Sequence, residues 1–220
     1  MNARPITNLL AGCLSLSLSA AVTAHSPKPD AKIQVFVYNY AGVAPATLAR
    51  SERIAAQIYA RAGLETEFFD CPLTPYQADQ FPACQIPNAP SALVMRVLSR
   101  SMSERAGLTQ AKFGSALLPL DGNPGVIAQV CAPCSEMLAK GSEPMYAMVL
   151  GHTMAHELGH LLLGVGSHGA TGLMHVPWNR KELECAAQGT LVFTSWEAEK
   201  MRRNAATRLA ASAAVNTASK

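Results

Sequence analysis

The feature that most constrains this chain is the run His156-Glu157-Leu158-Gly159-His160 inside a strongly apolar stretch. On an α-helix, residues four apart lie one above the other, so the imidazoles of His156 and His160 can reach one metal ion. Glu157 lies about 100° around the helix, where its carboxylate can take a proton from water at the metal without being a ligand. The spacing predicts a metal-binding helix with Glu157 as general base.

The residues on both sides of this motif are apolar, from Met145 to Leu163, which predicts a helix buried almost all round. Ser142 is suited to cap its start, and Gly159 inside it permits close packing of another element. Ionisable groups in a buried helix are costly unless they are paired or bound to a metal. The alternative to a metal site is a core helix whose histidines each find a separate hydrogen-bond partner.

A catalytic zinc ion has three protein ligands and one open position, so a third ligand must come from outside this helix. Gly164 ends the predicted helix, and His168 follows where the chain can fold back. We therefore expect His168 to be the third ligand. The alternatives are Glu182, Glu184 and His152, which lies one turn before His156.

His156, Glu157, His160, Gly164 and His168, followed by Gly172-Leu173-Met174, resemble the motif of the metzincin clan of zinc metallopeptidases. The spacing departs from the clan's pattern, which would place the glycine at Leu163 and the third ligand at Gly166. The region 145–203 is also similar to secreted bacterial proteins of metzincin-like type.

This resemblance implies an α+β, zincin-like fold. Its parts would be a mixed twisted sheet of four to five strands, a backing helix, a buried active-site helix and a C-terminal helix. It implies one zinc ion per chain, held by His156, His160 and His168, with Met174 packed beneath it. Residues 113–118 would form the cleft-edge strand that pairs with an extended substrate, although an ordinary inner strand is an equal alternative. The implied activity is that of a secreted zinc endopeptidase.

Residues 1–24 read as a signal peptide, with Arg4 before an apolar run and a Val-Thr-Ala cleavage site. Cleavage there predicts a secreted or periplasmic protein without a membrane span. Cys13 offers a second interpretation, because Leu10-Ala11-Gly12-Cys13 matches a lipoprotein processing box. Residues 25–210 are then one metallopeptidase-like domain, and the Ala/Ser-rich residues 211–220 a disordered tail.

Five cysteines follow the predicted signal peptide. Cys71 and Cys84 flank a proline-rich loop and are expected to form a disulfide in an exported protein. Cys131 and Cys134 have the spacing of a redox motif without its usual sequence context, so a structural bridge is favoured over an oxidoreductase site. Because the count is odd, one of Cys131, Cys134 and Cys185 is expected to be free.

The remaining strands and helices are predicted from the hydrophobic pattern and from the proline and glycine residues that interrupt it. Strands are expected at 33–38, 64–69, 92–98, 113–118 and 126–130, with a helix between Pro45 and Gly63 that makes a parallel β-α-β unit. Thr194-Ser195-Trp196-Glu197 predicts a capping box that opens a final helix to about Leu209.

The net charge of +3 falls to +2 when Arg4 is removed with the signal peptide (3 − 1 = 2), which argues against a nucleic-acid or anionic-membrane partner. We expect a monomer acting on a peptide or protein substrate. The main alternative is a non-catalytic exported domain with a structural or vestigial zinc site, and a smaller one is a zinc hydrolase of a non-peptide amide.

Overall fold

The computed structural model describes residues 32–74, 79–85, 90–109, 111–119 and 124–218. The predicted signal peptide, including Cys13, lies outside the described residues.

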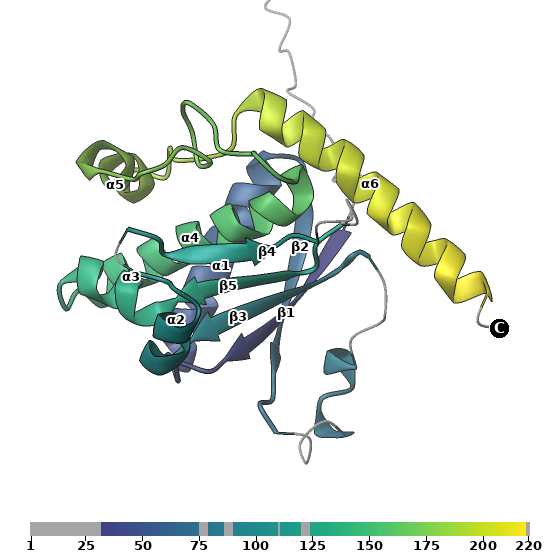
Figure 1. The fold of residues 1–220 in the computed structure, drawn as a ribbon, viewed down its shortest axis with the longest axis horizontal. Coiled ribbons are helices and arrows are strands. Elements are labelled where there is room, and N and C mark those ends of the chain that lie inside the picture. Colours follow the sequence, from purple (N-terminus) through teal and green to yellow (C-terminus); the bar gives the residue numbers. More distant parts are fainter. Residues whose placement is uncertain (1–31, 75–78, 86–89, 110, 120–123, 219–220) are drawn as a thin grey trace, which may run out of the picture.

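A five-stranded sheet forms the centre of the molecule (Figure 1). Its strands are β1 (Lys32–Asn39), β2 (Glu65–Cys71), β3 (Ala92–Leu98), β4 (Gly114–Leu117) and β5 (Ile127–Cys131). They lie in the order β2-β1-β3-β5-β4, and every neighbouring pair is parallel except β4 with β5. The predicted β-α-β unit is present as β1, α1 and β2, and the mixed sheet agrees with the expected architecture.

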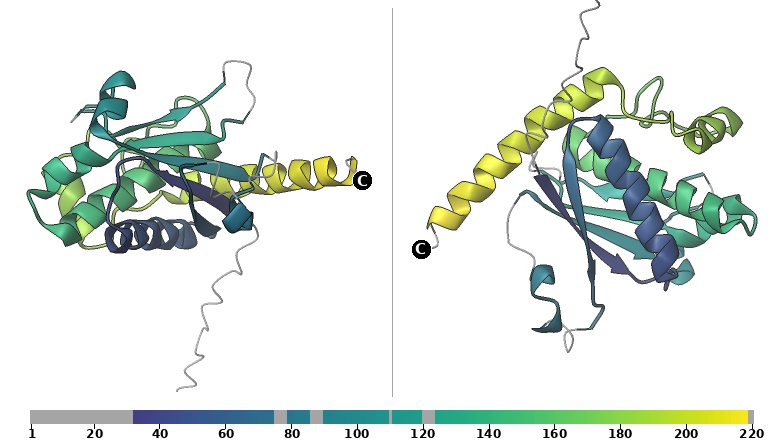
Figure 2. Two further views of the ribbon diagram at one scale, coloured as in Figure 1. Left: turned by 90° about the horizontal axis from the view of Figure 1, so that it is seen from below. Right: turned by 180° about the vertical axis from the view of Figure 1, so that it is seen from behind.

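The helices are α1 (Pro45–Arg61), α2 (Arg100–Arg105), α3 (Ala132–Ala139), α4 (Glu143–Leu163), α5 (Arg180–Ala187) and α6 (Ser195–Ala218), with a short 3-10 helix η2 (Pro82–Cys84). Helices α1 and α4 cover the same face of the sheet (Figure 2). Alternate strand residues point to that face and form the main core with them, because successive side chains in a strand face opposite ways. These strand residues are Ile33, Val35, Val37, Leu93, Met95, Val97, Ala128 and Val130.

Helix α4 is buried over nearly its whole length, as the apolar flanks of its motif predicted. Two glycines let other elements approach its backbone. A Cβ at Gly151 would lie 2.5 Å from the Ser51 carbonyl oxygen of α1, and one at Gly159 would lie 2.9 Å from the ring of Phe193 and 3.0 Å from the sulfur of Met174. The close packing predicted at Gly159 is therefore confirmed.

Helix α6 begins with the predicted capping box, in which Thr194 and Glu197 exchange two hydrogen bonds of 2.7 and 3.3 Å. It continues to Ala218, so the prediction of a helix ending near Leu209 and a disordered segment after it was wrong for residues 211–218. Alanine, which is frequent there, has the highest intrinsic helix propensity. The Ser212 hydroxyl also contacts Ser91, accepting a bond from its backbone N–H at 3.1 Å.

Two side chains of α6 support the end of α4. Asn204 donates a hydrogen bond to the carbonyl oxygen of Leu162, and the buried Arg208 donates to those of Leu161, Gly125 and Pro90. The last carbonyl groups of a helix have no partner within it, so these contacts satisfy groups that would otherwise be buried alone.

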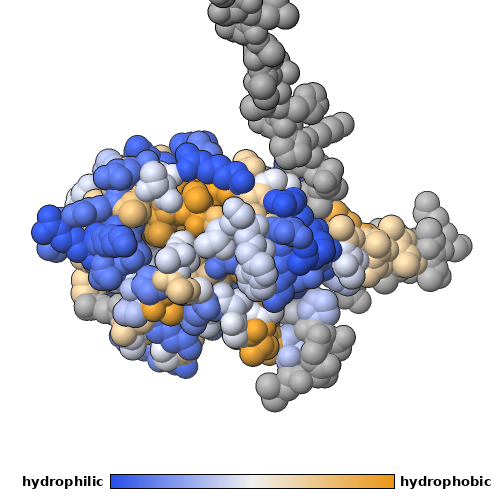
Figure 3. All heavy atoms as spheres, turned by 90° about the horizontal axis from the view of Figure 1, so that it is seen from above, coloured by the Kyte–Doolittle hydropathy of each residue, from blue (hydrophilic) through white to orange (hydrophobic). Residues whose placement is uncertain are grey.

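The face of the molecule seen from above is mostly hydrophilic, with hydrophobic residues in separate small patches (Figure 3). Among the described helices, none is both long enough and apolar enough to cross a membrane.

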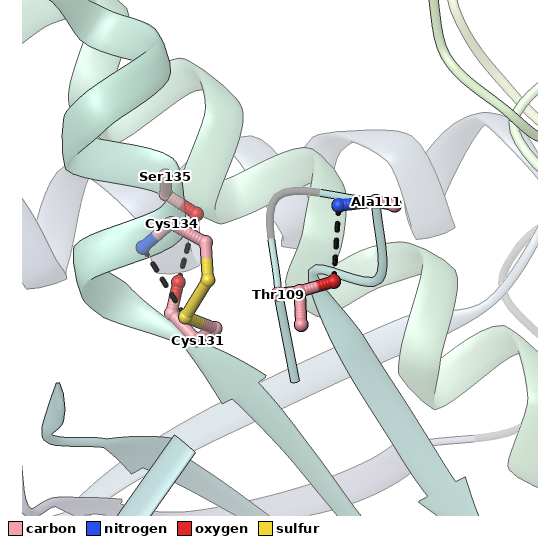
Figure 4. Close-up of a disulfide and its surroundings, with 5 residues drawn as sticks. All are labelled: Thr109, Ala111, Cys131, Cys134 and Ser135. Atoms are coloured by element: carbon pink, nitrogen blue, oxygen red, sulfur yellow. Dashed lines mark hydrogen bonds between the residues drawn. A yellow bond between two sulfur atoms is a disulfide. The ribbon is translucent and has the colours of Figure 1, made fainter. Parts of the chain in front are cut away.

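Both expected disulfides are present. Cys71 is bonded to Cys84 and Cys131 to Cys134, while Cys185 is free. The second bridge lies where β5 passes into α3, and the Cys134 backbone N–H donates to the Cys131 sulfur at 3.2 Å (Figure 4). Cys131 and Cys134 are buried against Leu98 and Leu108, which agrees with a structural bridge.

Candidate metal centre and cleft

A cleft of about 400 Å³ lies between α4, the edge strand β4 and the loop that follows α4. Helix α4 contributes Thr153, His156, Glu157 and His160 to its wall. The residues around β4 contribute Lys112 to Ala116 and Leu118, and the loop contributes residues 165–168 and 176–178. Strand β4 has β5 on one side only, so the segment expected at the cleft edge is an edge strand beside the histidines.

His156 and His160 point their Nε2 atoms at each other across 3.1 Å, while their Nδ1 atoms are held by the loop. The Nδ1 of His156 donates to the Leu173 carbonyl oxygen at 2.8 Å, which leaves a lone pair on Nε2. The Nδ1 of His160 lies 2.7 Å from the Ser167 hydroxyl oxygen. When the Ser167 hydroxyl oxygen accepts a hydrogen bond from the His160 Nδ1–H, the Nε2 of His160 also carries a lone pair. The lone pairs of the two Nε2 atoms then face each other, and a cation between them stabilises this arrangement.

His168 completes a cluster with these two residues. One ligand atom from each of the three histidines lies within 4.8 Å of the others, and no other group of this kind occurs among the described residues. Zn–N bonds of about 2.0–2.1 Å in a tetrahedral site separate the nitrogens by about 3.3 Å. The 3.1 Å between the Nε2 atoms of His156 and His160 fits that geometry. The three residues could therefore hold a zinc ion.

Burial keeps the two helical histidines neutral. It lowers the pKa of His156 to about 4 against the opposing hydrogen bond to Leu173, and it lowers the pKa of His160 to about 3, with help from the neighbouring imidazoles. A neutral imidazole is the form that binds a metal ion. Both residues are thus in the ligand form at neutral pH.

Glu157 is 6% exposed and lies against the backbone of β4. A Cβ at Gly114 would lie 2.5 Å from the Cγ of Glu157 and 2.7 Å from its Oε1, so only glycine leaves room for this carboxyl group. Burial raises the pKa of Glu157 to about 8, and the charge of Lys112 opposes that effect. Burial therefore makes this carboxyl group more basic than an ordinary glutamate, as a general base requires.

The three alternative ligands lie outside the histidine cluster and have other partners. His152 Nδ1 bonds the Met148 carbonyl oxygen at 2.8 Å inside α4. Glu182 accepts from the backbone N–H of Asn179 as part of a capping box, and Glu184 pairs with Arg180.

Met174 is fully buried and lies against Gly159, next to His160 in α4. Its carbonyl oxygen accepts from the Gly169 N–H at 3.0 Å, which closes the loop around His168. Trp178 lines the cleft, and its ring meets that of His156 edge-on, with centroids 5.7 Å apart. The Trp178 Nε1 is buried without a hydrogen-bond partner among the described residues.

Several parts of this site were not identified from the sequence. Ser167 and the Leu173 carbonyl group, which orient the two imidazoles, carry no signal beyond their nearness to the motif. Gly114 is one of many glycines. Its contact with Glu157 depends on how β4 is placed against α4, which the sequence of the α4 motif does not indicate.

No family model and no curated protein matches the sequence. Two solved structures are similar in fold. A zinc-dependent peptidase from Methanocorpusculum labreanum has a TM-score of 0.51 and 15% sequence identity, over 76% of this chain and 99% of that one. Archaemetzincin from Methanopyrus kandleri has a TM-score of 0.49 and 16% identity, over 83% of this chain and 98% of that one.

The chain therefore has the mixed α/β fold of a zinc-dependent peptidase. At 15% identity the first likeness concerns the fold alone, so the chemistry must be argued from this chain's own residues.

Proposed function

We propose that this protein is a secreted zinc-dependent endopeptidase of metzincin-like type. The observation that carries the proposal is the convergence of His156, His160 and His168 beside the buried Glu157, in a cleft bordered by an edge strand.

His156, His160 and His168 are the ligands in this proposal, and Leu173 and Ser167 fix the orientation of the first two. Hydrogen bonds of this kind hold metal-binding imidazoles in place and select their tautomer. Met174 packs beneath α4 at Gly159 and supports the helix where the ligands leave it.

When bound, zinc polarises a substrate carbonyl and lowers the pKa of a water molecule. Glu157 takes the proton of the attacking water and passes it to the leaving nitrogen. Its carboxyl group is enclosed by the β4 backbone at Gly114 and is therefore held in one place for both transfers.

The free edge of β4 gives the substrate its orientation. An extended peptide can add to such an edge through main-chain hydrogen bonds, which are independent of side-chain sequence. A substrate bound along β4 passes the histidine cluster in its middle, which favours cleavage within a chain.

Export from the cytoplasm is part of the proposal. It is supported by the signal-like residues 1–24 and by two disulfides, which persist mainly in oxidising compartments. Western analysis of culture medium, periplasm and membranes would test it, and a Cys13→Ala variant would identify lipid anchoring by its release from the membrane.

The first test is zinc content and peptide hydrolysis in protein purified without chelators. We expect about one zinc per chain in the wild type and in Glu157→Gln, and a large loss in His168→Ala. The control is His175→Ala, a loop histidine outside the cluster. Glu157→Gln should lower the rate of hydrolysis by about 10²–10⁴-fold.

Three results would contradict parts of the proposal. Equal zinc in the wild type and in His168→Ala removes this residue from the ligand set. Zinc binding without hydrolysis of any peptide in a broad library favours the non-catalytic alternative. Absence of zinc from the wild type removes the proposed function.

A further inference from the structure

Lys112 is the one lysine among the described residues that line the cleft, and no arginine lines it. It is exposed, and it lies two residues before β4 on the wall of the cleft. A permanent positive charge in this position will act on any ligand in the cleft.

The backbone of Lys112 is held on both sides. Its N–H donates to the Thr109 carbonyl oxygen at 2.9 Å, and its own carbonyl oxygen accepts from the Thr109 N–H at 3.0 Å. The Thr109 hydroxyl also accepts from the Ala111 N–H, in a turn drawn beside the Cys131–Cys134 disulfide (Figure 4). Lys112 is therefore anchored at one point of the cleft wall.

Phe113 fixes the backbone on the C-terminal side of Lys112. The Phe113 carbonyl oxygen accepts from the Cys131 N–H at 2.7 Å, so the strand that follows Lys112 is bonded to a residue locked by a disulfide. Because the backbone is fixed on both sides, the ammonium group can move only by rotation about the bonds of the Lys112 side chain.

Among the residues that the structure describes, the ammonium group has no ion-pair partner. None of the ion pairs among the described residues includes Lys112, although its charge acts on Glu157. Four other Lys and Arg side chains of the described residues are in ion pairs: Lys32, Arg50, Arg180 and Arg203. Lys112 is therefore available to an anionic group of a ligand.

We propose that Lys112 determines specificity by selecting substrates that place a carboxylate at the β4 side of the cleft. This inference rests on the proposed peptidase function. The carboxylate is either an acidic side chain or the free C-terminus of the peptide. Phe113, Val176 and Trp178 line the same cleft and offer apolar surface to the rest of the ligand. A hydrogen bond between the ammonium group and a carboxylate is charge-assisted and therefore stronger than one between neutral groups.

The test measures binding to zinc-loaded protein by calorimetry. The probes are peptides with a zinc-binding hydroxamate at either end and Glu or Gln at successive positions. For probes with an N-terminal hydroxamate, the C-terminus is either the free acid or the amide. These comparisons separate the two sources of the carboxylate.

For wild-type protein we expect at least one acidic probe to bind about 10–100-fold more tightly than its neutral partner, as for a hydrogen bond to a charged group. Lys112→Met should abolish the difference, and Lys112→Glu should favour probes with lysine at the same position. Lys140→Met, an exposed lysine at the end of α3, should behave as wild type.

Equal binding of acidic and neutral probes, binding of neither, or a preference that persists in Lys112→Met would overturn the inference. A carboxylate preference without cleavage of any peptide would retain the role of Lys112 and refute the peptidase function. Cleavage without a carboxylate preference would retain the peptidase function and refute the role of Lys112.

Discussion

Gly114→Ala tests whether the β4 backbone positions the general base. The added Cβ would lie 2.5 Å from the Cγ of Glu157, 2.7 Å from its Oε1 and 2.7 Å from the Gln129 carbonyl oxygen. Ordinary contacts begin near 3.4 Å, so either the carboxyl group or the strand must move by about 1 Å. The contact with the Gln129 carbonyl oxygen can be relieved only by a shift of β4 against β5, whereas the two contacts with Glu157 push its flexible side chain away.

Displacing a catalytic group by 1 Å can cost about 10²-fold in rate. We expect kcat/KM for a cleaved peptide to fall by about that factor in Gly114→Ala, with zinc content unchanged because the histidines are not touched. Overpacking should also lower the free energy of unfolding by about 1–3 kcal/mol.

The matched control is Gly151→Ala, where a Cβ would lie 2.5 Å from the Ser51 carbonyl oxygen and 2.9 Å from Ile54, two residues of α1 that do not line the cleft. It should lose comparable stability and keep its activity. If Gly114→Ala retains the wild-type kcat/KM, the carboxyl group does not depend on this contact, and the reasoning is refuted.

Three further predictions concern stability. Arg208→Met should lower the free energy of unfolding in urea by about 2–5 kcal/mol, because it leaves buried carbonyl groups without a donor. Burial, and then Asp70, raises the pKa of Glu52 to about 8 in the folded protein, above its ordinary value of 4.5. The contribution of Glu52 to stability is therefore highest below pH 4.5 and falls, by at most about 5 kcal/mol, as the pH rises to 8. Glu52→Gln should remove this fall. Replacing Cys131 and Cys134 by alanine should cost about 2 kcal/mol of loop-closure entropy and speed hydrogen exchange at residues 108–113.

A control or a contradicting result goes with each of these predictions. Unchanged stability in Arg208→Met would mean that water replaces the guanidinium group. Parallel pH–stability curves for the wild type and Glu52→Gln would refute the raised pKa, and the exposed Glu104→Gln should follow the wild type. Opening Cys71–Cys84, which closes the longer loop, should cost about 3 kcal/mol without changing exchange at 108–113.

The long elements were predictable because each carries its own pattern. The β-branched residues around Val35 indicate β1, and the continuous apolar run around Leu158 indicates α4, with limits close to those observed. The helices α2, α3 and α5, of six to eight residues, were missed. A helix of two turns is too short to show a hydrophobic period, and its stability comes from packing rather than propensity.

The candidate site also contains residues that the sequence predicted and residues that it did not. His156, Glu157 and His160 share one helix, so their spacing alone predicted that they act together. His168 was identified from the helix stop at Gly164, and the structure brings it to the pair. The groups that orient and enclose them depend on tertiary contacts, and the proximity of Gly114 to Glu157 follows from how β4 packs against α4, which no local pattern encodes.

The bonds from Asn204 and Arg208 to the last turn of α4 have a consequence for synthesis. Helix α6 follows every other described element in the chain, so α4 emerges with Leu161 and Leu162 still lacking their partners. The loop that carries His168 leaves from this same end of the helix. The end of α4 next to the histidine cluster therefore gains these bonds only after α6 has been translated and has docked.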